Sequence, residues 1–219
     1  MRVRSDGQPL SATTAAVLGT VVLWATSPVA SSSGGVATDT LRAKVMLGYQ
    51  GWFGATGDGC CSEYGWTHWS QSKGEPAPGD LAFDLWPDMA EYPPSSLFRS
   101  SHLHLANGSA AALYSPYVPA AIDVHFRWMR EYGLDGIFAQ RFIHDVVDPT
   151  SCKSQHFWRV LQSVARSASA HSRVWAIRYD LTGYNSTTAG VPLIDALTAD
   201  WKLLVQKMGI LREPSQYLH

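Results

Sequence analysis

The 219-residue chain lacks the sequence marks of several large protein classes. Its net charge is −1, so no excess of positive charge points to nucleic acid or to an anionic membrane as a partner. No GxGxxG fingerprint and no P-loop follows any apolar segment, which removes the strongest argument for a nucleotide-binding doubly wound fold. A hydrophobic share of 46% and a charged share of 16% exclude a disordered chain and favour a globular one.

Cysteine is also scarce. The chain has the adjacent pair Cys60 and Cys61 and one distant cysteine, Cys152. These three have no CxxC spacing and no His cluster beside them, so the sequence predicts no zinc site and no other metal site. In an oxidising compartment the simplest arrangement is one disulfide and one free thiol.

Long apolar runs are missing too, with one partial exception near the N-terminus. Residues 15–25 form an apolar run after the basic residues Arg2 and Arg4, and small residues follow it up to Ala30. The run is shorter than the ~20 apolar residues that cross a bilayer comfortably. We interpret residues 1–35 as a cleaved signal peptide and linker, which predicts a secreted or secretory-pathway protein. The alternative is that residues 15–30 remain as an uncleaved membrane anchor.

The chain is rich in aromatic residues, with nine Trp and nine Tyr. Such rings offer flat apolar faces with a polar edge, which suit sugar rings as well as protein cores. After the first strand, the Gly-, Pro- and Trp-rich residues 51–119 predict an ordered cap with one short helix near residues 86–92. The apolar periodicity predicts strands at 44–49, 134–140 and 173–179, and helices at 120–132, 157–168 and 193–208.

Strands and helices that alternate in this way specify a parallel sheet with crossover helices. We therefore predict an α/β fold in which residues 36–219 form the N-terminal portion of a (β/α)8 TIM barrel. About the first three of the eight βα units are present, because no fourth strand is recognisable after residue 209.

In parallel barrels the active site is lined by residues at the carboxyl ends of the strands. This rule selects Tyr49, Gln50, Trp52, Phe53, Asp58, Glu63, His68 and Trp69 after the first strand, Gln140, Arg141, His144 and Asp145 after the second, and Tyr179, Asp180 and Tyr184 after the third. Aromatic rings, carboxylates and amides on one rim form a plausible sugar-binding surface. The same rim would carry all three cysteines, so we expect Cys152 to bond to one member of the 60/61 pair.

Among these candidates we expect Asp180 to contact a substrate; the alternative is a turn residue, because Asp is also common in turns of purely structural function. Glycoside hydrolysis usually needs two carboxyl groups across the scissile bond. Asp180 could supply one of them, and no convincing second carboxyl group ends a predicted strand.

Five segments resemble the glycoside hydrolase family 71/99-like group, which includes endo-α-mannosidases and α-1,3-glucanases. The segments are GYQGWFG (48–54), GWTHWS (65–70), FDLWPDMAEY (83–92), VHFRWMREYGLDGIFAQRF (124–142) and VWAIRYDLTG (174–183). The resemblance implies a (β/α)8 barrel without a cofactor. It also implies substrate contacts from Tyr49, Trp52, His68, Trp69, Gln140, Arg141, Tyr179 and Asp180.

In this group the catalytic glutamates lie further along the barrel, and the sequence contains no Glu-x-x-Glu. The catalytic residues are therefore expected downstream of His219. The predicted function is that of a glycoside hydrolase acting on an α-linked glycan, with a carbohydrate as its partner. The alternative is a non-catalytic carbohydrate-binding or degenerate barrel fragment.

Overall fold

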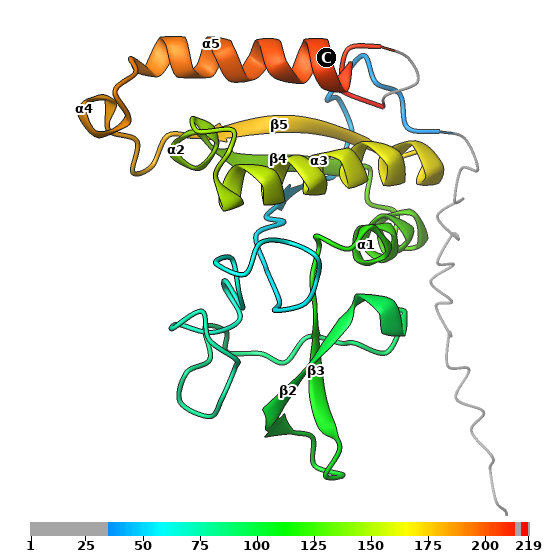
Figure 1. Ribbon diagram of the computed structural model, residues 1–219. Coiled ribbons are helices and arrows are strands. Elements are labelled where there is room, and N and C mark those ends of the chain that lie inside the picture. Colours follow the sequence, from blue (N-terminus) through cyan, green and yellow to red (C-terminus); the bar gives the residue numbers. More distant parts are fainter. Residues whose placement is uncertain (1–34, 213–215, 219) are drawn as a thin grey trace, which may run out of the picture. The chain divides into compact units, whose positions relative to one another are not determined.

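A computed structural model describes residues 35–212 and 216–218 of the chain, within the unit Ser32–His219 (Figure 1). The targeting segment predicted for residues 1–35 lies outside these residues, apart from Gly35. Within the described part, every helix is too short or too polar to cross a membrane.

The centre of the fold is a three-stranded sheet made of β1 (Met46–Tyr49), β4 (Gly136–Phe142) and β5 (Val174–Asp180). The strand order is β1-β4-β5, and both neighbouring pairs are parallel. The three predicted strands and their parallel arrangement are thus confirmed, with boundaries shifted by up to two residues. The described strands do not close into a barrel, so the barrel remains a prediction.

The helices that follow these strands are also close to their predicted positions. They are α1 (Pro119–Glu131), the short α2 (Ile143–Val146), α3 (Cys152–His171), α4 (Ser186–Ala189) and α5 (Leu193–Leu203), which continues as the π-helix η2 (Leu204–Met208). Helix α3 begins at Cys152 instead of residue 157, because the Ser151 side chain accepts a hydrogen bond from the Ser154 N–H and caps it.

Helices α1 and α5 lie on the same face of the sheet. The Tyr49 hydroxyl of β1 is hydrogen-bonded to Nδ1 of His125 on α1 at 2.8 Å, and Arg141 of β4 binds Asp200 of α5. Tyr49 is the register partner of Ala139, and Arg141 lies two residues further along β4, so both side chains leave the same face. We call this the helix-covered face.

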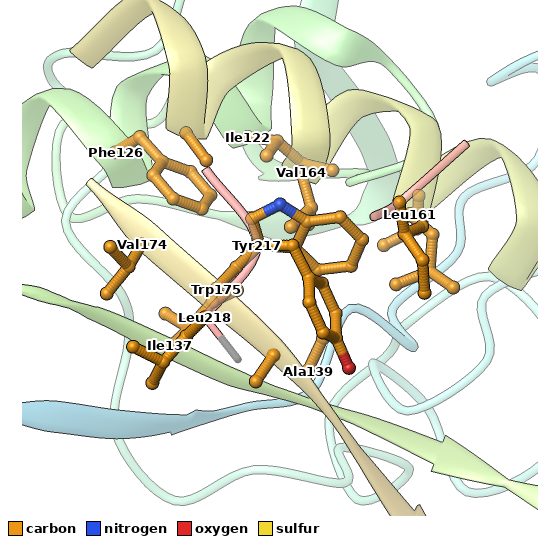
Figure 2. Packing of buried hydrophobic residues seen from close by; sticks show 14 of the residues in the cluster. Ile122, Phe126, Ile137, Ala139, Leu161, Val164, Val174, Trp175, Tyr217 and Leu218 are labelled. Carbon is orange, nitrogen blue, oxygen red and sulfur yellow. The ribbon is translucent and has the colours of Figure 1, made fainter. Parts of the chain in front are cut away.

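The main core lies between the helix-covered face and helices α1 and α3 (Figure 2). Ile137 and Trp175 are fully buried there against Phe126 of α1 and Val164 of α3. Burying one such apolar side chain stabilises a fold by about 1.5–3 kcal/mol. This core holds the three strands in place and so positions their carboxyl ends.

A short segment near the C-terminus, residues 216–218, lies beside β5 at the edge of the sheet. Tyr217 forms a parallel bridge with Trp175, whose N–H donates to the Gln216 carbonyl at 3.1 Å and whose carbonyl accepts from the Leu218 N–H at 2.8 Å. This is an isolated bridge and not a strand, so among the described residues no strand follows residue 209, as expected. The segment is too short to show any hydrophobic period, so the sequence could not reveal it.

The cap between β1 and α1 differs from its prediction. No helix forms at residues 86–92, and the regular elements are η1 (Pro94–Ser96) and an antiparallel pair, β2 (Leu97–His104) and β3 (Ala110–Tyr114). Asn107-Gly108 turns the chain between the two strands, with Gly108 in the left-handed region at φ 81°. Polar residues in β2 hide its alternation, which explains why the hairpin was missed.

Candidate functional site

The predicted site residues of β4 and β5 divide between the two faces of the sheet. Gln140 and Arg178 are register partners, and so are Arg141 and Tyr179. Because adjacent residues of a strand point to opposite faces, Arg141 and Tyr179 lie on the helix-covered face, while Gln140 and Asp180 lie on the other, which we call the open face.

Arg141 and Tyr179 form a buried group with Asp200 of α5. Arg141 donates two hydrogen bonds to the Asp200 carboxylate, from Nε at 2.7 Å and from a terminal nitrogen at 2.5 Å, and the Tyr179 hydroxyl donates a third at 2.7 Å. The Arg141 side chain is 2% exposed. Its predicted contact with substrate finds no support, because the guanidinium anchors α5 to the sheet.

Trp69 and Tyr49 are also placed in structural surroundings. Trp69 is 3% exposed in the core of the cap, where its Nε1–H donates to the Tyr114 carbonyl at 2.9 Å. The Tyr49 hydroxyl lies against His125, whose other ring nitrogen is 2.6 Å from the Tyr92 hydroxyl. Burial lowers the pKa of His125 to about 4, so the ring is neutral at pH 7. This Tyr–His–Tyr group joins β1, α1 and the cap.

The open face carries a row of hydrogen-bonded polar side chains at the carboxyl end of the sheet. Gln140 is at its centre: its Oε1 accepts from Gln50 and from Arg178, both at 2.9 Å, and its Nε2 donates to Asp180 at 2.6 Å. Gln50 and Arg178 are exposed, while Gln140 and Asp180 are half-buried. We call these four residues the polar row.

Asp180 has a second partner within its own loop, since its Oδ1 accepts from the Thr182 N–H at 2.8 Å. The hydrogen bonds from Thr182, together with Arg178 and Gln140, lower the pKa of Asp180 below its usual value. The carboxylate is therefore ionised at neutral pH, as an acceptor and not as an acid. Its bond to Thr182 supports the turn role, and its bond to Gln140 joins it to the polar row.

Beside the polar row is a pocket of about 410 Å³ between the loops that follow β1 and β4 and the first turns of α3. Phe142, which ends β4 and is the register partner of Asp180, belongs to its lining and links it to the polar row. The residues that line it are Trp52, Tyr64, Thr67, His68, Ser70, Gln71, Lys73, Ala82, Phe142, His144, Asp145, Lys153 and Phe157.

Three aromatic rings are stacked in this lining. Trp52 is stacked on His68, at 4.1 Å between ring centroids, and on Phe142, at 5.8 Å, with interplanar angles of 18° and 13°. Of the three rings in this stack, His68 is the exposed one. Trp52 and His68 thus line one pocket, while their contact with a sugar remains a prediction.

Lys153 and His144 lie against Asp145 in this pocket. Its Oδ1 lies 2.6 Å from Nζ of Lys153 and 3.0 Å from Nε2 of His144. His144 and Asp145 were selected by their position after β4, whereas Lys73 and Lys153 were missed. Lys153 is the second residue of α3, and no sequence pattern distinguishes it from an ordinary lysine on a helix surface.

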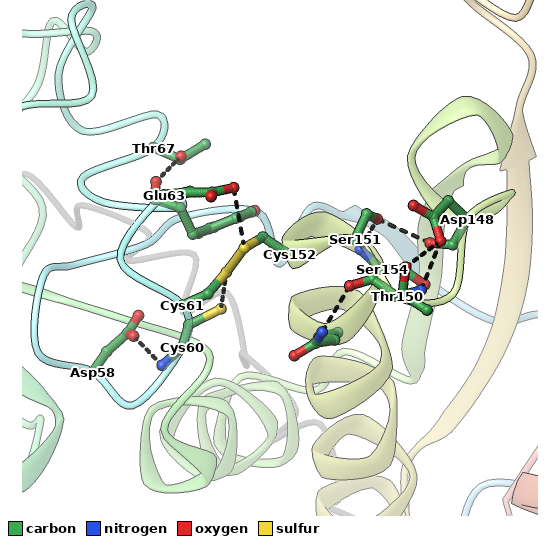
Figure 3. Close-up of a disulfide and its surroundings, with 12 residues drawn as sticks. Asp58, Cys60, Cys61, Glu63, Thr67, Asp148, Thr150, Ser151, Cys152 and Ser154 are labelled. Carbon is green, nitrogen blue, oxygen red and sulfur yellow. Dashed lines mark hydrogen bonds between the residues drawn. A yellow bond between two sulfur atoms is a disulfide. The ribbon is translucent and has the colours of Figure 1, made fainter. Parts of the chain in front are cut away.

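A disulfide links the loop after β1 to the start of helix α3 (Figure 3), and both of these segments contribute residues to the pocket. Cys61, in the loop after β1, is bonded to Cys152, the first residue of α3, with their Cα atoms 5.9 Å apart. The prediction that Cys152 pairs with one of the adjacent cysteines is confirmed. Cys60 keeps a free thiol, and burial raises its pKa to about 11.

Comparison of the chain with protein families, curated proteins and solved structures gives no match. The assignment to a glycosidase group rests on the five sequence segments alone. Among the described residues, no group of three or more His, Cys, Asp or Glu side chains is placed to hold a metal ion. The chemistry that this site offers is hydrogen bonding by amides and carboxylates, beside aromatic rings and ammonium groups.

Proposed function

We propose that the carboxyl end of the sheet is the sugar-binding part of a barrel-type glycoside hydrolase that acts on an α-linked glycan. The observation that carries the proposal is the polar row, which lies next to an aromatic-lined pocket at the edge where parallel barrels bind their substrates. Amide and carboxylate groups hydrogen-bond sugar hydroxyls, while rings contact the apolar faces of the sugar.

Within the polar row, each side chain has a distinct part in this proposal. Asp180 accepts hydrogen bonds from hydroxyls as an ion, which makes those bonds stronger than neutral ones. Gln50 and Arg178 are exposed and present donors. Gln140 holds Asp180 and Arg178 in position through its two ends.

A second candidate is a non-catalytic carbohydrate-binding protein. The general acid of a glycosidase needs a raised pKa, and Asp180 has a lowered one. We therefore assign the catalytic acid to no described residue. Binding without hydrolysis by this chain fits both candidates, whereas hydrolysis by this chain alone would contradict the assignment of Asp180 as a binding residue only.

The same proposal includes passage through the secretory pathway. The Cys61–Cys152 disulfide supports it, because such bonds persist mainly in oxidising compartments. Expression of the whole chain in a eukaryotic cell, followed by N-terminal sequencing of the material in the medium, tests it. Retention of an intact N-terminus in a membrane fraction would favour the uncleaved anchor.

The test of sugar binding is calorimetric titration of the whole chain with oligosaccharides of α-1,3-glucan and α-mannan, and with cellotetraose as a β-linked control. We expect the α-linked series to bind, and Gln140→Ala to weaken that binding about tenfold, as the loss of hydrogen bonds to charged groups implies. Tyr132→Ala is the matched control, because Tyr132 is 75% exposed and follows the last residue of α1. Equal binding by both variants would contradict the proposed site.

A further inference from the structure

The charges around the pocket are mostly positive. Two lysines line it, Lys73 and Lys153, and the described lining residues include one carboxylate, Asp145. That carboxylate is already paired with Lys153 at 2.6 Å and lies 3.0 Å from His144. Lys73 therefore remains without a neutralising carboxylate in the described lining.

The pKa of His68 reflects the same positive surroundings. Its pKa lies below the usual value, first because the ring is partly removed from water, and then because the ammonium groups of Lys153 and Lys73 oppose a further positive charge. Asp145 acts in the opposite direction. Both lysines thus act on the exposed end of the aromatic stack, where a sugar would enter.

The backbone holds His68 and Lys73 in unusual conformations. Both are non-glycine residues in the left-handed region, at φ 63° and φ 61°. The Trp66 N–H donates to the Lys73 carbonyl at 3.0 Å, and a Cβ on Gly65 would lie 2.6 Å from that same oxygen. Such conformations cost free energy and cluster at ligand sites. Here these left-handed residues define the conformation of the loop that places Lys73 at the pocket.

We propose that the pocket takes an acidic sugar, one that carries a carboxylate, as in a uronic-acid residue of the glycan. The inference rests on the proposed sugar-binding function and names the class of its substrate. An anionic group near Lys73 and Lys153 forms charge-assisted hydrogen bonds and balances the positive charge, whereas a neutral sugar does neither. The ring of that sugar lies against His68, and its hydroxyls reach toward the polar row.

The test uses two ligands with the same sugar backbone, one with ionised carboxylates and one with uncharged methyl esters. The whole chain is titrated with α-1,4-trigalacturonate and with its fully methyl-esterified form, and a sulfated trisaccharide without carboxylates is a third arm. We expect the acid to bind at least tenfold more tightly than its ester, with affinity that falls between 50 and 200 mM NaCl. Tighter binding of the sulfated arm than of the acid would overturn the choice of a carboxylate.

Variants of Lys73 test whether this residue causes the preference for the acid over its ester. Lys73→Asn removes the charge with a residue that tolerates the left-handed region, so the loop is kept. We expect it to weaken binding of the acid about tenfold and binding of the ester little, with recovery in Lys73→Arg. Lys202→Gln, an exposed lysine of α5, is the control and leaves both affinities unchanged.

The outcomes separate this inference from the function it rests on. If the ester binds as tightly as the acid, the pocket does not select acidic sugars, and the proposed sugar-binding function stands. If neither trigalacturonate form binds while neutral α-linked oligosaccharides do, the inference is again overturned alone. If no oligosaccharide binds at all, both proposals are wrong.

Discussion

The two faces of the sheet carry similar residues in opposite surroundings. On the helix-covered face, Arg141 is paired with Asp200 and almost fully buried. On the open face, Arg178 and Asp180 share the amide of Gln140 at the solvent boundary. Separating the first pair would leave an unpaired charge buried away from water, which is costly, so this pair fixes α5 to β4. Access to water leaves the second group free to exchange its partners for a ligand.

Breaking the buried pair should give the largest effect. Arg141→Met leaves the Asp200 carboxylate buried with the Tyr179 hydroxyl as its remaining partner, and we expect a loss of about 3–5 kcal/mol in the free energy of unfolding. Urea denaturation measures it. The double variant Arg141→Met/Asp200→Leu should recover most of the loss, since an apolar pair of similar volume is nearly neutral.

The matched control on the open face is Arg178→Met. Exposed charges contribute about 1 kcal/mol or less to stability, so this variant should unfold nearly as the parent does. Equal losses from Arg141→Met and Arg178→Met would show that the distinction between the two faces is wrong.

The disulfide should have the next largest effect. Cys152→Ser opens a link between residues 91 apart in sequence, and we expect a loss of about 2–4 kcal/mol in unfolding free energy. Cys60→Ser changes a free thiol and serves as the control, with little expected effect. A loss from Cys60→Ser as large as that from Cys152→Ser would mean that Cys60, and not Cys61, is the partner of Cys152.

Low pH should destabilise the fold through its buried histidines. His156 is fully buried, its Nε2 lies 2.8 Å from the Gly51 carbonyl, and burial lowers its pKa to about 4. The unfolded chain takes up a proton near pH 6.5, whereas the folded one does so only near pH 4. Stability should therefore be constant above about pH 6.5 and fall by about 2–3 kcal/mol per such histidine as the pH drops to 4.

The pH dependence can be assigned with one variant. His156→Gln cannot take up a proton, so its unfolding free energy should fall less steeply between pH 6.5 and 4 than that of the parent chain. His102→Gln, at an exposed position of the cap hairpin, should leave the slope unchanged. A parent profile that is flat over this range would contradict the neutral, buried state of His156.

The smallest effect on stability is expected from Asp180→Asn. The Asn Oδ1 can still accept from the Thr182 N–H, so the unfolding free energy should change by less than about 1 kcal/mol. Binding of α-linked oligosaccharides should weaken about tenfold, because a charged acceptor is lost. Unchanged binding together with a clear loss of stability would make Asp180 a turn residue only.

Strand alternation explains which site residues could be predicted from the sequence. The apolar periodicity located β4 and β5 correctly, but the rule that strand ends line a barrel site selected the neighbours Gln140 and Arg141 together. Two adjacent strand residues cannot face the same side, and the sequence does not show which of them faces the helices. Burial of Arg141 is decided by Asp200 of α5, 59 residues away.

The cap could be predicted less well than the helices, for a different reason. The periodicity of α1 and α3 is strong, and both helices were predicted, because packing against the sheet requires an apolar stripe. In the cap, Trp69 is buried by contacts with Tyr114 and Phe83, which lie on other segments. Lys73 and Lys153 line the same pocket only because of tertiary folding, so local sequence patterns could not identify them.

The Cys61–Cys152 bond closes the polypeptide into a covalent ring. The ring contains most of the cap, including the β2–β3 hairpin, as well as helix α1 and strand β4. A single protease cut anywhere between these cysteines, for example at the exposed hairpin tip around Asn107, therefore leaves one covalent molecule. On a non-reducing gel the nicked protein runs as one species, and two fragments separate only after reduction.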